Sequence, residues 1–329
     1  MGAVPMVELW RGGRMESRHL GHAVVWHTDA GLVESWGDAG QVIFPRSSCK
    51  MIQALPLMES GAGAGLRPEQ LALLCASHQG AALHVGAVRR WLADLGMSGA
   101  DLRCGAHEPG DRDERDRLIR AHEAPCQCHN NCSGKHTGFL MMNRHLKGDA
   151  EYVDPSHPLQ TAIRQVFDEV TGEASPGFGI DGCSAPNFAT SVTGLARAMA
   201  AFAGASGDGD ARDRAMVALR EAMAAHPDHV AGEGRACTEL MRAMGGRVAI
   251  KTGAEAVFVA ILPEQRLGFA LKIADGGTRA AEAAICALLV RHGVLDPDHP
   301  ATRKRLNAVQ TNWRGFETGA VQPAPGFPG

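Results

Sequence analysis

The stretch FPRSSCK, residues 44–50, marks the point at which a strand pattern gives way to a helix pattern. Ser47 and Lys50 lie three positions apart at the expected helix start, so their side chains share one face. If Ser47 is an ordinary N-cap, position 50 is the place where a capping box has Glu or Gln. Lys50 instead puts a positive charge at the positive end of the helix dipole. Because local rules are most often broken at functional sites, this stretch is a candidate site.

The S-x-x-K spacing also has a chemical interpretation. Burial and the positive end of a helix dipole both favour the neutral form of a lysine amine. A neutral amine can accept a proton from a nearby serine and turn that serine into a nucleophile. Since S-x-x-K occurs often by chance, the motif alone does not decide between a helix cap and a catalytic pair.

A second motif, Lys251-Thr252-Gly253, ends a strand that we expect from Val248-Ala249-Ile250. S-x-x-K at a helix start and K-T-G on a later strand form the signature pair of serine acyl-transfer enzymes of the β-lactamase and penicillin-binding type. The order of elements agrees, since strands, the S-x-x-K helix, further helices and the K-T-G strand follow one another. The two motifs together favour the catalytic interpretation.

The two ends of the chain carry strand patterns, and the middle carries helix patterns. Residues 5–45 and 246–295 supply the expected sheet, and residues 46–245 a helical lobe. This separation predicts an α/β protein of the α+β type, in which an antiparallel sheet from both chain ends carries packed helices and an inserted helical lobe. We expect one catalytic domain over 1–318 and a flexible Pro/Gly-rich tail over 319–329.

Individual elements follow from local signals. A hairpin is expected around Asp29-Ala30-Gly31, and Pro68 is expected in the first turn of a helix. Thr278 is expected to cap a helix near the end of the chain. Helical periodicity also occurs over residues 85–95, 114–121, 137–145, 159–170, 190–202 and 211–225.

Composition excludes several classes of protein. The 329 residues carry a net charge of −3 without a basic stripe, which argues against a nucleic-acid partner. No apolar run reaches the roughly 18 residues of a membrane span, and the start of the chain lacks the apolar core of a signal peptide. Nine cysteines, an odd number, then predict a reducing compartment, the cytoplasm, rather than a disulfide framework.

A cluster of cysteines and histidines lies in CQCHNNCSGKH, residues 126–136. Fifty residues later a Gly-rich turn places Cys183 beside Asp181. Dense Cys/His clusters are zinc candidates, although this spacing is not that of a closed four-cysteine site. An open site with few protein ligands is one interpretation, and reduced buried cysteines near an irregular loop are the other.

Five segments considered together resemble one known family. FPRSSCKMIQALP, CASHQG, HNNCSGKHTGFL, GIDGCSAPNF and AIKTGAE resemble the Rhizobium-type L-asparaginases, also called the class 3 or asparaginase II family. The resemblance covers about residues 5 to 318, with the motifs in order and at family-like spacing. It implies a fold related to serine β-lactamases and glutaminases, in agreement with the S-x-x-K and K-T-G motifs.

The resemblance implies roles for particular residues. Ser47 and Lys50 would form one Ser-Lys pair, and Ser77 and Lys251 a second. Two further sets of residues are implied: Cys132, Lys135 and Cys183 would hold one zinc ion per chain, and Arg46, His136 and Asp181 would contact the substrate. The resemblance assigns no role to Cys126 and Cys128.

The expected activity is therefore that of an amidohydrolase, which converts L-asparagine to L-aspartate and ammonia through a β-aspartyl-enzyme on Ser47. Three alternatives remain open at this stage: a glutaminase, a penicillin-interacting enzyme and a non-catalytic zinc-binding module. One substrate methylene changes binding by only about 1–3 kcal/mol, so glutamine is a close competitor. The expected partner is a small-molecule substrate, without nucleic acid or membrane, and the resemblance favours a homodimer.

Overall fold

The computed structural model describes residues 2–328, which form two compact units. Unit 1 combines both ends of the chain, up to Ser48 and from Glu239 onward, with Thr190–Gly204. Unit 2 contains Cys49–Ala189 and Ala205–Thr238. The residues expected in one catalytic domain over 1–318 lie in both units, and the content of the units is close to the expected division into a sheet and a helical lobe.

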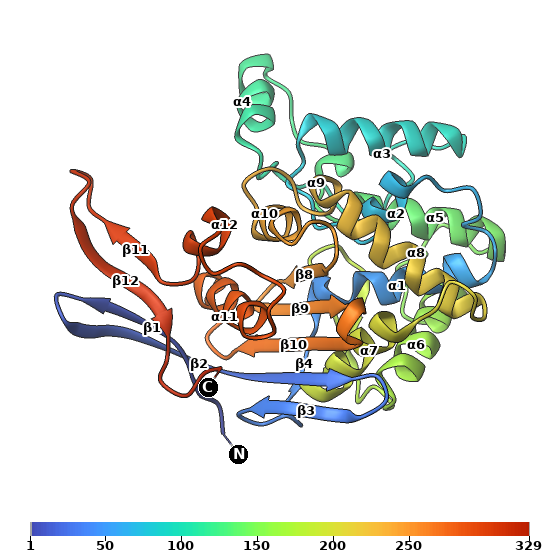
Figure 1. Cartoon of the computed structure of the whole chain (residues 1–329). Helices are drawn as coiled ribbons and strands as arrows, with labels where there is room; N and C mark the ends of the chain where they lie inside the picture. The colour runs from blue at the N-terminus through green and yellow to red at the C-terminus, as the bar shows by residue number, and fades with distance from the viewer. Residues whose placement is uncertain (1, 329) are drawn as a thin grey trace. The chain divides into compact units, whose positions relative to one another are not determined.

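Unit 1 is built on an eight-stranded antiparallel sheet (Figure 1). The strands follow the order β11-β12-β1-β2-β10-β9-β8, and β3 pairs with β2 beside this path. Their bounds are β1 Val4–Arg11, β2 Arg14–His27, β3 Gly31–Trp36, β8 Ala249–Gly253, β9 Val257–Leu262, β10 Leu267–Ile273, β11 Ala308–Thr311 and β12 Glu317–Pro323. The expected antiparallel sheet from both chain ends is confirmed.

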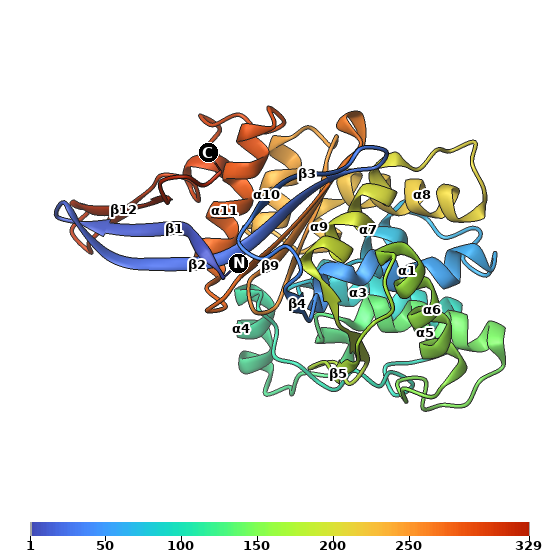
Figure 2. The same ribbon diagram turned by 90° about the horizontal axis from the view of Figure 1, so that it is seen from below.

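Two helices cover the central strands of unit 1. Helix α7, Val192–Gly204, and helix α11, Thr278–Arg291, both pack on β9 and β10, and Figure 2 shows them on opposite sides of the sheet. All six residues of β9 are buried, as a strand covered on both faces requires. Gly268 of β10 lies so close to α7 that a Cβ there would collide with the helix backbone.

The C-terminal strand β12 corrects the sequence prediction. Residues 319–323 were expected in a flexible tail, but β12 lies between β11 and β1, with Val7 opposite Pro323. A Cβ on Gly319 would collide with the carbonyl oxygen of Trp10. Glycine weakens an isolated strand, but at position 319 it permits close pairing with β1. Local strand propensity cannot predict a pairing between residues so far apart in the sequence.

Unit 2 is mainly helical. Its central helix α1, Lys50–Glu59, is buried from Lys50 to Leu57 and contacts α2, α5, α6 and α8. The other elements of this unit are α2 Pro68–Leu74, α3 Ala82–Asp94, α4 Arg112–Ala121, α5 Ser133–Leu146, α6 Pro158–Thr171, α8 Ala211–Ala225, α9 Pro227–Val230 and the hairpin β5 Phe178–Ile180 and β6 Pro186–Phe188. Helix α10, Ala236–Ala243, crosses the boundary between the units.

Element boundaries agree with the sequence where a local signal sets them. Helix α8 begins after Asp210, whose side chain accepts the N–H of Asp213, and its bounds are those predicted. Thr278 was expected to cap α11, but it is the first helical residue and follows Gly277. The helix expected from residue 190 begins two residues later, because Thr190–Ser191 forms β7, which pairs with β4, Val42–Ile43.

The described chain, residues 2–328, contains no helix with the length and apolarity of a membrane crossing. Within the same residues all nine cysteines are free thiols.

Candidate active site and metal centre

The Ser47 turn belongs to unit 1. Residues Arg46–Cys49 form a 3₁₀ turn, η1, and the α-helix begins only at Lys50, so Ser47 is not the N-cap. Arg46 has a φ of +54°, a left-handed conformation that is strained for a residue other than glycine. The turn is fixed by Ser48, whose Oγ donates to the Pro45 carbonyl at 2.7 Å. Ser47 itself is half-buried at this tight turn.

The K-T-G segment lies against the same turn within unit 1. It forms the end of β8, as predicted, and a Cβ on Gly253 would collide with the Pro45 carbonyl and press on the Ser48 backbone nitrogen. Only glycine permits this approach of the strand to the turn. Lys251 is buried, and its Nζ donates to the Thr252 carbonyl at 2.7 Å.

A pocket of about 470 Å³ opens beside the Ser47 turn in unit 1. Arg46 and Phe44 line it on one side, together with His22, Glu255 and Lys272 of the sheet unit. Its wall thus contains two cationic side chains, Arg46 and Lys272, and one carboxylate, Glu255. A guanidinium group such as that of Arg46 is suited to bind a carboxylate.

Lys50, Ser77 and Cys132 meet in the interior of unit 2. The Nζ of Lys50, which is 1% exposed, lies 3.1 Å from Ser77 Oγ and 3.1 Å from Cys132 Sγ, and it donates to the Ala76 carbonyl. The family resemblance pairs Lys50 with Ser47 and Ser77 with Lys251. In the structure Lys50 of the first pair also contacts Ser77 of the second pair.

The Ser77 segment lies between helices α2 and α3, outside regular secondary structure. Helix α2 ends at Leu74, and the chain then runs without regular structure through Ser77. The backbone N–H groups of Ser77 and Gln79 donate to the carbonyls of Val230 and Ala231, at 2.9 and 3.0 Å. The segment is thus held by backbone bonds to the last residue of α9 and to the residue that follows it.

Three candidate zinc ligands form one buried cluster in unit 2. Lys135 Nζ lies 3.2 Å from Cys183 Sγ, and Cys132 Sγ donates to Asn131 Oδ1 at 3.0 Å. The interaction with Cys132 lowers the pKa of Cys183, and Lys135 lowers it further against the effect of burial. The interaction with Cys183 raises the pKa of Cys132, as burial also does. These directions favour the thiolate at Cys183 and the thiol at Cys132.

The proton on Lys135 is retained despite burial. Desolvation lowers the pKa of Lys135, but the sulfur atoms of Cys183 and Cys132 more than offset this and raise it overall. Two sulfur atoms and one nitrogen converge here, which is a donor set suited to zinc with one position left for another ligand. A zinc ion would replace the protons of Cys132 and Lys135. The residues present therefore fit the expected metal.

Asp181 and Cys183 lie in the turn of the β5–β6 hairpin. Ser184 N–H donates to the Asp181 carbonyl at 2.8 Å, and Ser184 takes a left-handed φ of +67°. This turn aims Cys183 inward while Asp181 stays half-exposed. The Asp181 carboxylate is also close enough to raise the pKa of Lys135. The hairpin thus carries both a candidate zinc ligand, Cys183, and a candidate substrate-binding residue, Asp181.

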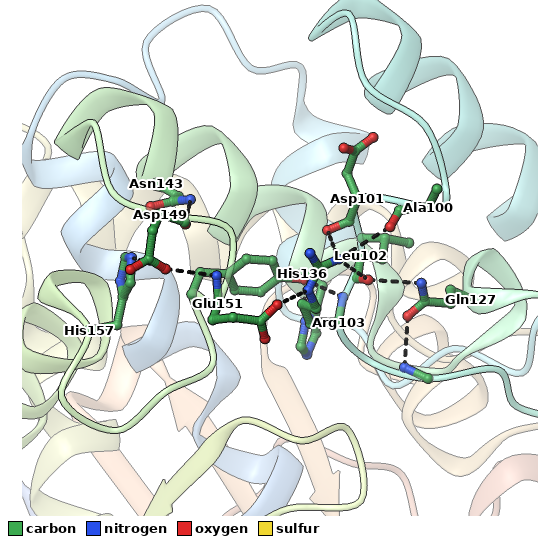
Figure 3. Close-up of polar contacts among 12 residues, drawn as sticks. Ala100, Asp101, Leu102, Arg103, Gln127, His136, Asn143, Asp149, Glu151 and His157 are labelled. Atoms are coloured by element: carbon green, nitrogen blue, oxygen red, sulfur yellow. Dashed lines mark hydrogen bonds and ion pairs between the residues drawn. The ribbon is translucent and has the colours of Figure 1, made fainter.

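His136 follows Lys135 on α5 and is wholly buried. Its Nδ1 lies 3.0 Å from the hydroxyl of Tyr152, and burial lowers the pKa of His136 to about 4, although the nearby Cys183 acts in the opposite direction. Tyr152 accepts the N–H of Arg103 at 2.7 Å. Figure 3 shows Arg103 held in turn by Glu151 and by neighbouring backbone carbonyls. This network fixes a neutral imidazole beside Cys183.

Tyr152 contacts the candidate site residue His136, a contact that sequence reasoning missed. It is the only tyrosine in the chain and is fully buried, but it lies outside the five motifs. Cys126 and Cys128 remain without an assigned role. Cys126 Sγ lies 3.2 Å from His129 Nδ1 and near Arg89, and burial raises the pKa of Cys128 to about 11.

The candidate residues thus fall into two sets. The structure places Arg46, Ser47 and Lys251 in unit 1. Unit 2 brings together the rest of the predicted site: Lys50, Ser77, Cys132, Lys135, His136, Asp181 and Cys183. The chain crosses from one unit to the other between Ser48 and Cys49, inside the S-x-x-K motif.

Comparison with known proteins identifies the class as amide hydrolases. The profile of the family described as L-asparaginase II matches residues 7–323, and the chain belongs to this family. No curated protein sequence matches the chain.

Several solved structures are similar. Mglu, a glutaminase, has 12% identity and a TM-score of 0.45, with 85% of this chain covered. The chain spans 66% of that protein's length. A β-lactamase from Mycobacterium bovis has 13% identity and a TM-score of 0.36, covering 84% of this chain and 95% of its own. D-alanine carboxypeptidase AmpC from Burkholderia cenocepacia has 13% identity and a TM-score of 0.39, covering 83% and 93%.

Proposed function

We propose that the protein is an L-asparaginase in which Ser47 is the nucleophile. The observation that carries the proposal is the buried Lys50 amine, 3.1 Å from the Ser77 hydroxyl and three residues from Ser47. A lysine next to a hydroxyl in a dry interior is suited to move a proton. Membership of the L-asparaginase II family supports an amide as the substrate.

Ser47 Oγ attacks the side-chain amide carbon of L-asparagine. Its proton passes to the amine of Lys50, directly or through a relay of Ser77 and Lys251, and is then delivered to the leaving nitrogen. Ammonia departs, and Ser47 carries a β-aspartyl ester. Water then attacks the ester carbon and gives its proton to the same base, so that aspartate is released and the Ser47 hydroxyl is restored. Backbone N–H groups of the Ser47 turn stabilise the oxyanion of each step.

Charged side chains fix the orientation of the substrate. Arg46, which lines the pocket beside the Ser47 turn, pairs with the α-carboxylate. Asp181, half-exposed in its hairpin, pairs with the α-ammonium group. His136, neutral and held by Tyr152, offers a hydrogen bond to the substrate. These residues act by orientation and leave the proton transfers to the serines and lysines.

Zinc would be held by Cys132, Lys135 and Cys183. When bound, it supplies a Lewis acid that orients or polarises an oxygen of the substrate. Free thiols fit a reducing compartment, and we propose the cytoplasm as the location and a homodimer as the assembly.

The activity is tested by ammonia release from a panel of amides. We expect turnover of L-asparagine with a kcat/KM at least about tenfold above that for L-glutamine, the discrimination that one methylene provides. Nitrocefin should not be hydrolysed. Faster turnover of glutamine would make the protein a glutaminase, nitrocefin hydrolysis would favour a penicillin-interacting enzyme, and no turnover at all would leave a zinc-binding module.

The zinc centre is tested by metal analysis of purified, dialysed protein. We expect about one tightly held zinc per chain in the parent and its loss in Cys183→Ala, because two thiolates and an amine are the proposed ligands. Zinc affinity should rise with pH, since binding displaces the protons of Cys132 and Lys135, whose pKa values are raised. Cys286→Ala, at a buried cysteine of α11, is the control and should keep its zinc. A metal-free parent would refute the centre.

A further inference from the structure

A second group of possible metal ligands lies in unit 2, where α8 ends and α9 begins. His226, Asp228 and His229 each offer one ligand atom, and these three atoms lie within 4.8 Å of one another. All three residues are half-buried, so water does not surround them fully. Asp228 Oδ1 and His229 Nδ1 are already 3.1 Å apart. Among the described residues this is the one group of three histidine, cysteine or carboxylate side chains whose ligand atoms lie this close together.

We propose that His226, Asp228 and His229 bind a divalent transition-metal ion of the zinc type. Two imidazoles and one carboxylate form a donor set that zinc accepts, with bonds of about 2.1 Å and an open fourth position. Tetrahedral bonds of that length place ligand atoms roughly 3.4 Å apart, so the three side chains need only a small movement. The site takes its ion by coordination and differs from the thiolate cluster of Cys132, Lys135 and Cys183 in having no sulfur ligand.

A neighbouring pocket gives the ion access and contains one buried carboxylate oxygen that has no hydrogen-bond partner among the described residues. His229 lines a pocket of about 380 Å³ together with Glu69. Within residues 2–328, Glu69 Oε2 is buried without a hydrogen-bond partner, which is unfavourable for a carboxylate. A cation within reach of Glu69 would offset that cost. Arg67 and Arg90 line the same pocket, so coordination bonds must hold the ion against their positive charge.

A buried histidine supports the backbone of the ligand segment. His84 Nε2 lies 2.8 Å from the carbonyl oxygen of Asp228, and a carbonyl only accepts, so this nitrogen carries the proton. The bond anchors α9 to α3. Fixed supporting contacts of this kind hold metal ligands in place before the ion arrives.

The metal would stabilise the segment that carries Ser77. Residues Val230 and Ala231 directly follow the ligand His229, and their carbonyls accept the N–H groups of Ser77 and Gln79. Ordering of α9 by an ion therefore orders the partner of the Ser77 segment. The sequence alone does not link His226, Asp228 and His229 to the Ser77 segment. The link follows from the backbone bonds of Val230 and Ala231.

The binding test uses Co²⁺ and Zn²⁺ with the whole chain. Co²⁺ bound by thiolates gives a strong near-ultraviolet charge-transfer band, whereas Co²⁺ bound by imidazole and carboxylate gives only weak visible bands. We expect a second equivalent per chain that lacks the charge-transfer band. It should be lost in His229→Ala and in Asp228→Asn and kept in His145→Ala, an exposed histidine at the end of α5. No second equivalent in the parent, or its persistence in both ligand variants, would overturn the proposal.

Cys183→Ala separates this inference from the thiolate centre. After dialysis that variant should hold no zinc, but it should still take up one equivalent of added Zn²⁺ per chain, and the further change His229→Ala should abolish this uptake. In Cys183→Ala, added Zn²⁺ should slow amide hydrogen exchange at Ser77 and Gln79 at least tenfold, with no effect when His229→Ala is also present. Unchanged exchange on saturation with Zn²⁺ would disprove the link to the Ser77 segment. These measurements need no turnover, so they stand whether or not asparagine is the substrate.

Discussion

Replacement of Ser47 with alanine is expected to reduce kcat for L-asparagine by a factor on the order of 10⁴ or more, as loss of a serine nucleophile does in other hydrolases. The ester intermediate needs the Ser47 oxygen, and neither Ser48 nor Ser77 replaces it, because Ser48 Oγ donates to Pro45 and Ser77 is buried, unlike the half-buried Ser47. The measurement is ammonia release under saturating substrate, combined with trapping of the acyl-enzyme by mass spectrometry. The adduct should be present in the parent and missing in Ser47→Ala.

The fold must persist for this result to be informative. Ser47 is half-buried in a turn that Ser48 and Pro45 hold together, so its hydroxyl contributes little to the free energy of unfolding. Circular dichroism and thermal unfolding should therefore match the parent closely. Ser60→Ala, at the other end of α1, is the matched control and should retain activity. Full turnover by Ser47→Ala would show that Ser47 is not the nucleophile.

The second large effect is expected on stability, in Gly268→Ala. A Cβ at this position of β10 would overlap the backbone of Ala196, Met199 and Ala200 in α7. Backbone atoms cannot rotate away as a side chain does, so the helix must move off the sheet. Overpacking of this kind costs about 3 kcal/mol or more in the free energy of unfolding. Denaturant titration should show a lower midpoint with an unchanged m-value.

Gly207→Ala provides the control for that measurement. An added Cβ at Gly207 meets no atom within 4 Å, and the residue lies outside the left-handed region. Its effect on the free energy of unfolding should lie within about 1 kcal/mol of zero and on the stabilising side. Equal stability of Gly268→Ala and Gly207→Ala would mean that α7 does not pack on β10 as described.

The fold was predictable where local signals set it. The Asp29-Ala30-Gly31 turn joins β2 and β3 as expected, and the Asp210 cap starts α8 at the predicted residue. β12 was missed because its pairing partner, β1, lies at the other end of the sequence. Thr278 was misplaced by one residue because a cap depends on the backbone conformation of its neighbours, which the residue type alone does not determine.

The candidate site was predictable to a similar extent. Lys50 stood out because it broke a helix-start rule, and the structure shows its side chain buried against Ser77 and Cys132. Ser77 carried no signal of its own, because its segment has neither periodicity nor a regular cap. Tyr152 could not be inferred, since its role depends on contacts with His136 and Arg103 from two other segments.

The pairing of β12 with β1 has a consequence for biosynthesis. During synthesis β1 and β2 leave the ribosome early. Their partners β12 and β10 are synthesised much later, so these pairings cannot form until then. Unit 2, whose residues lie between these strands, can pack its helices during synthesis through contacts that are closer in sequence. The early strands meanwhile carry unpaired edges, which invite association between nascent chains. Slowing translation late in the message should therefore lower the yield of native protein more than slowing it early.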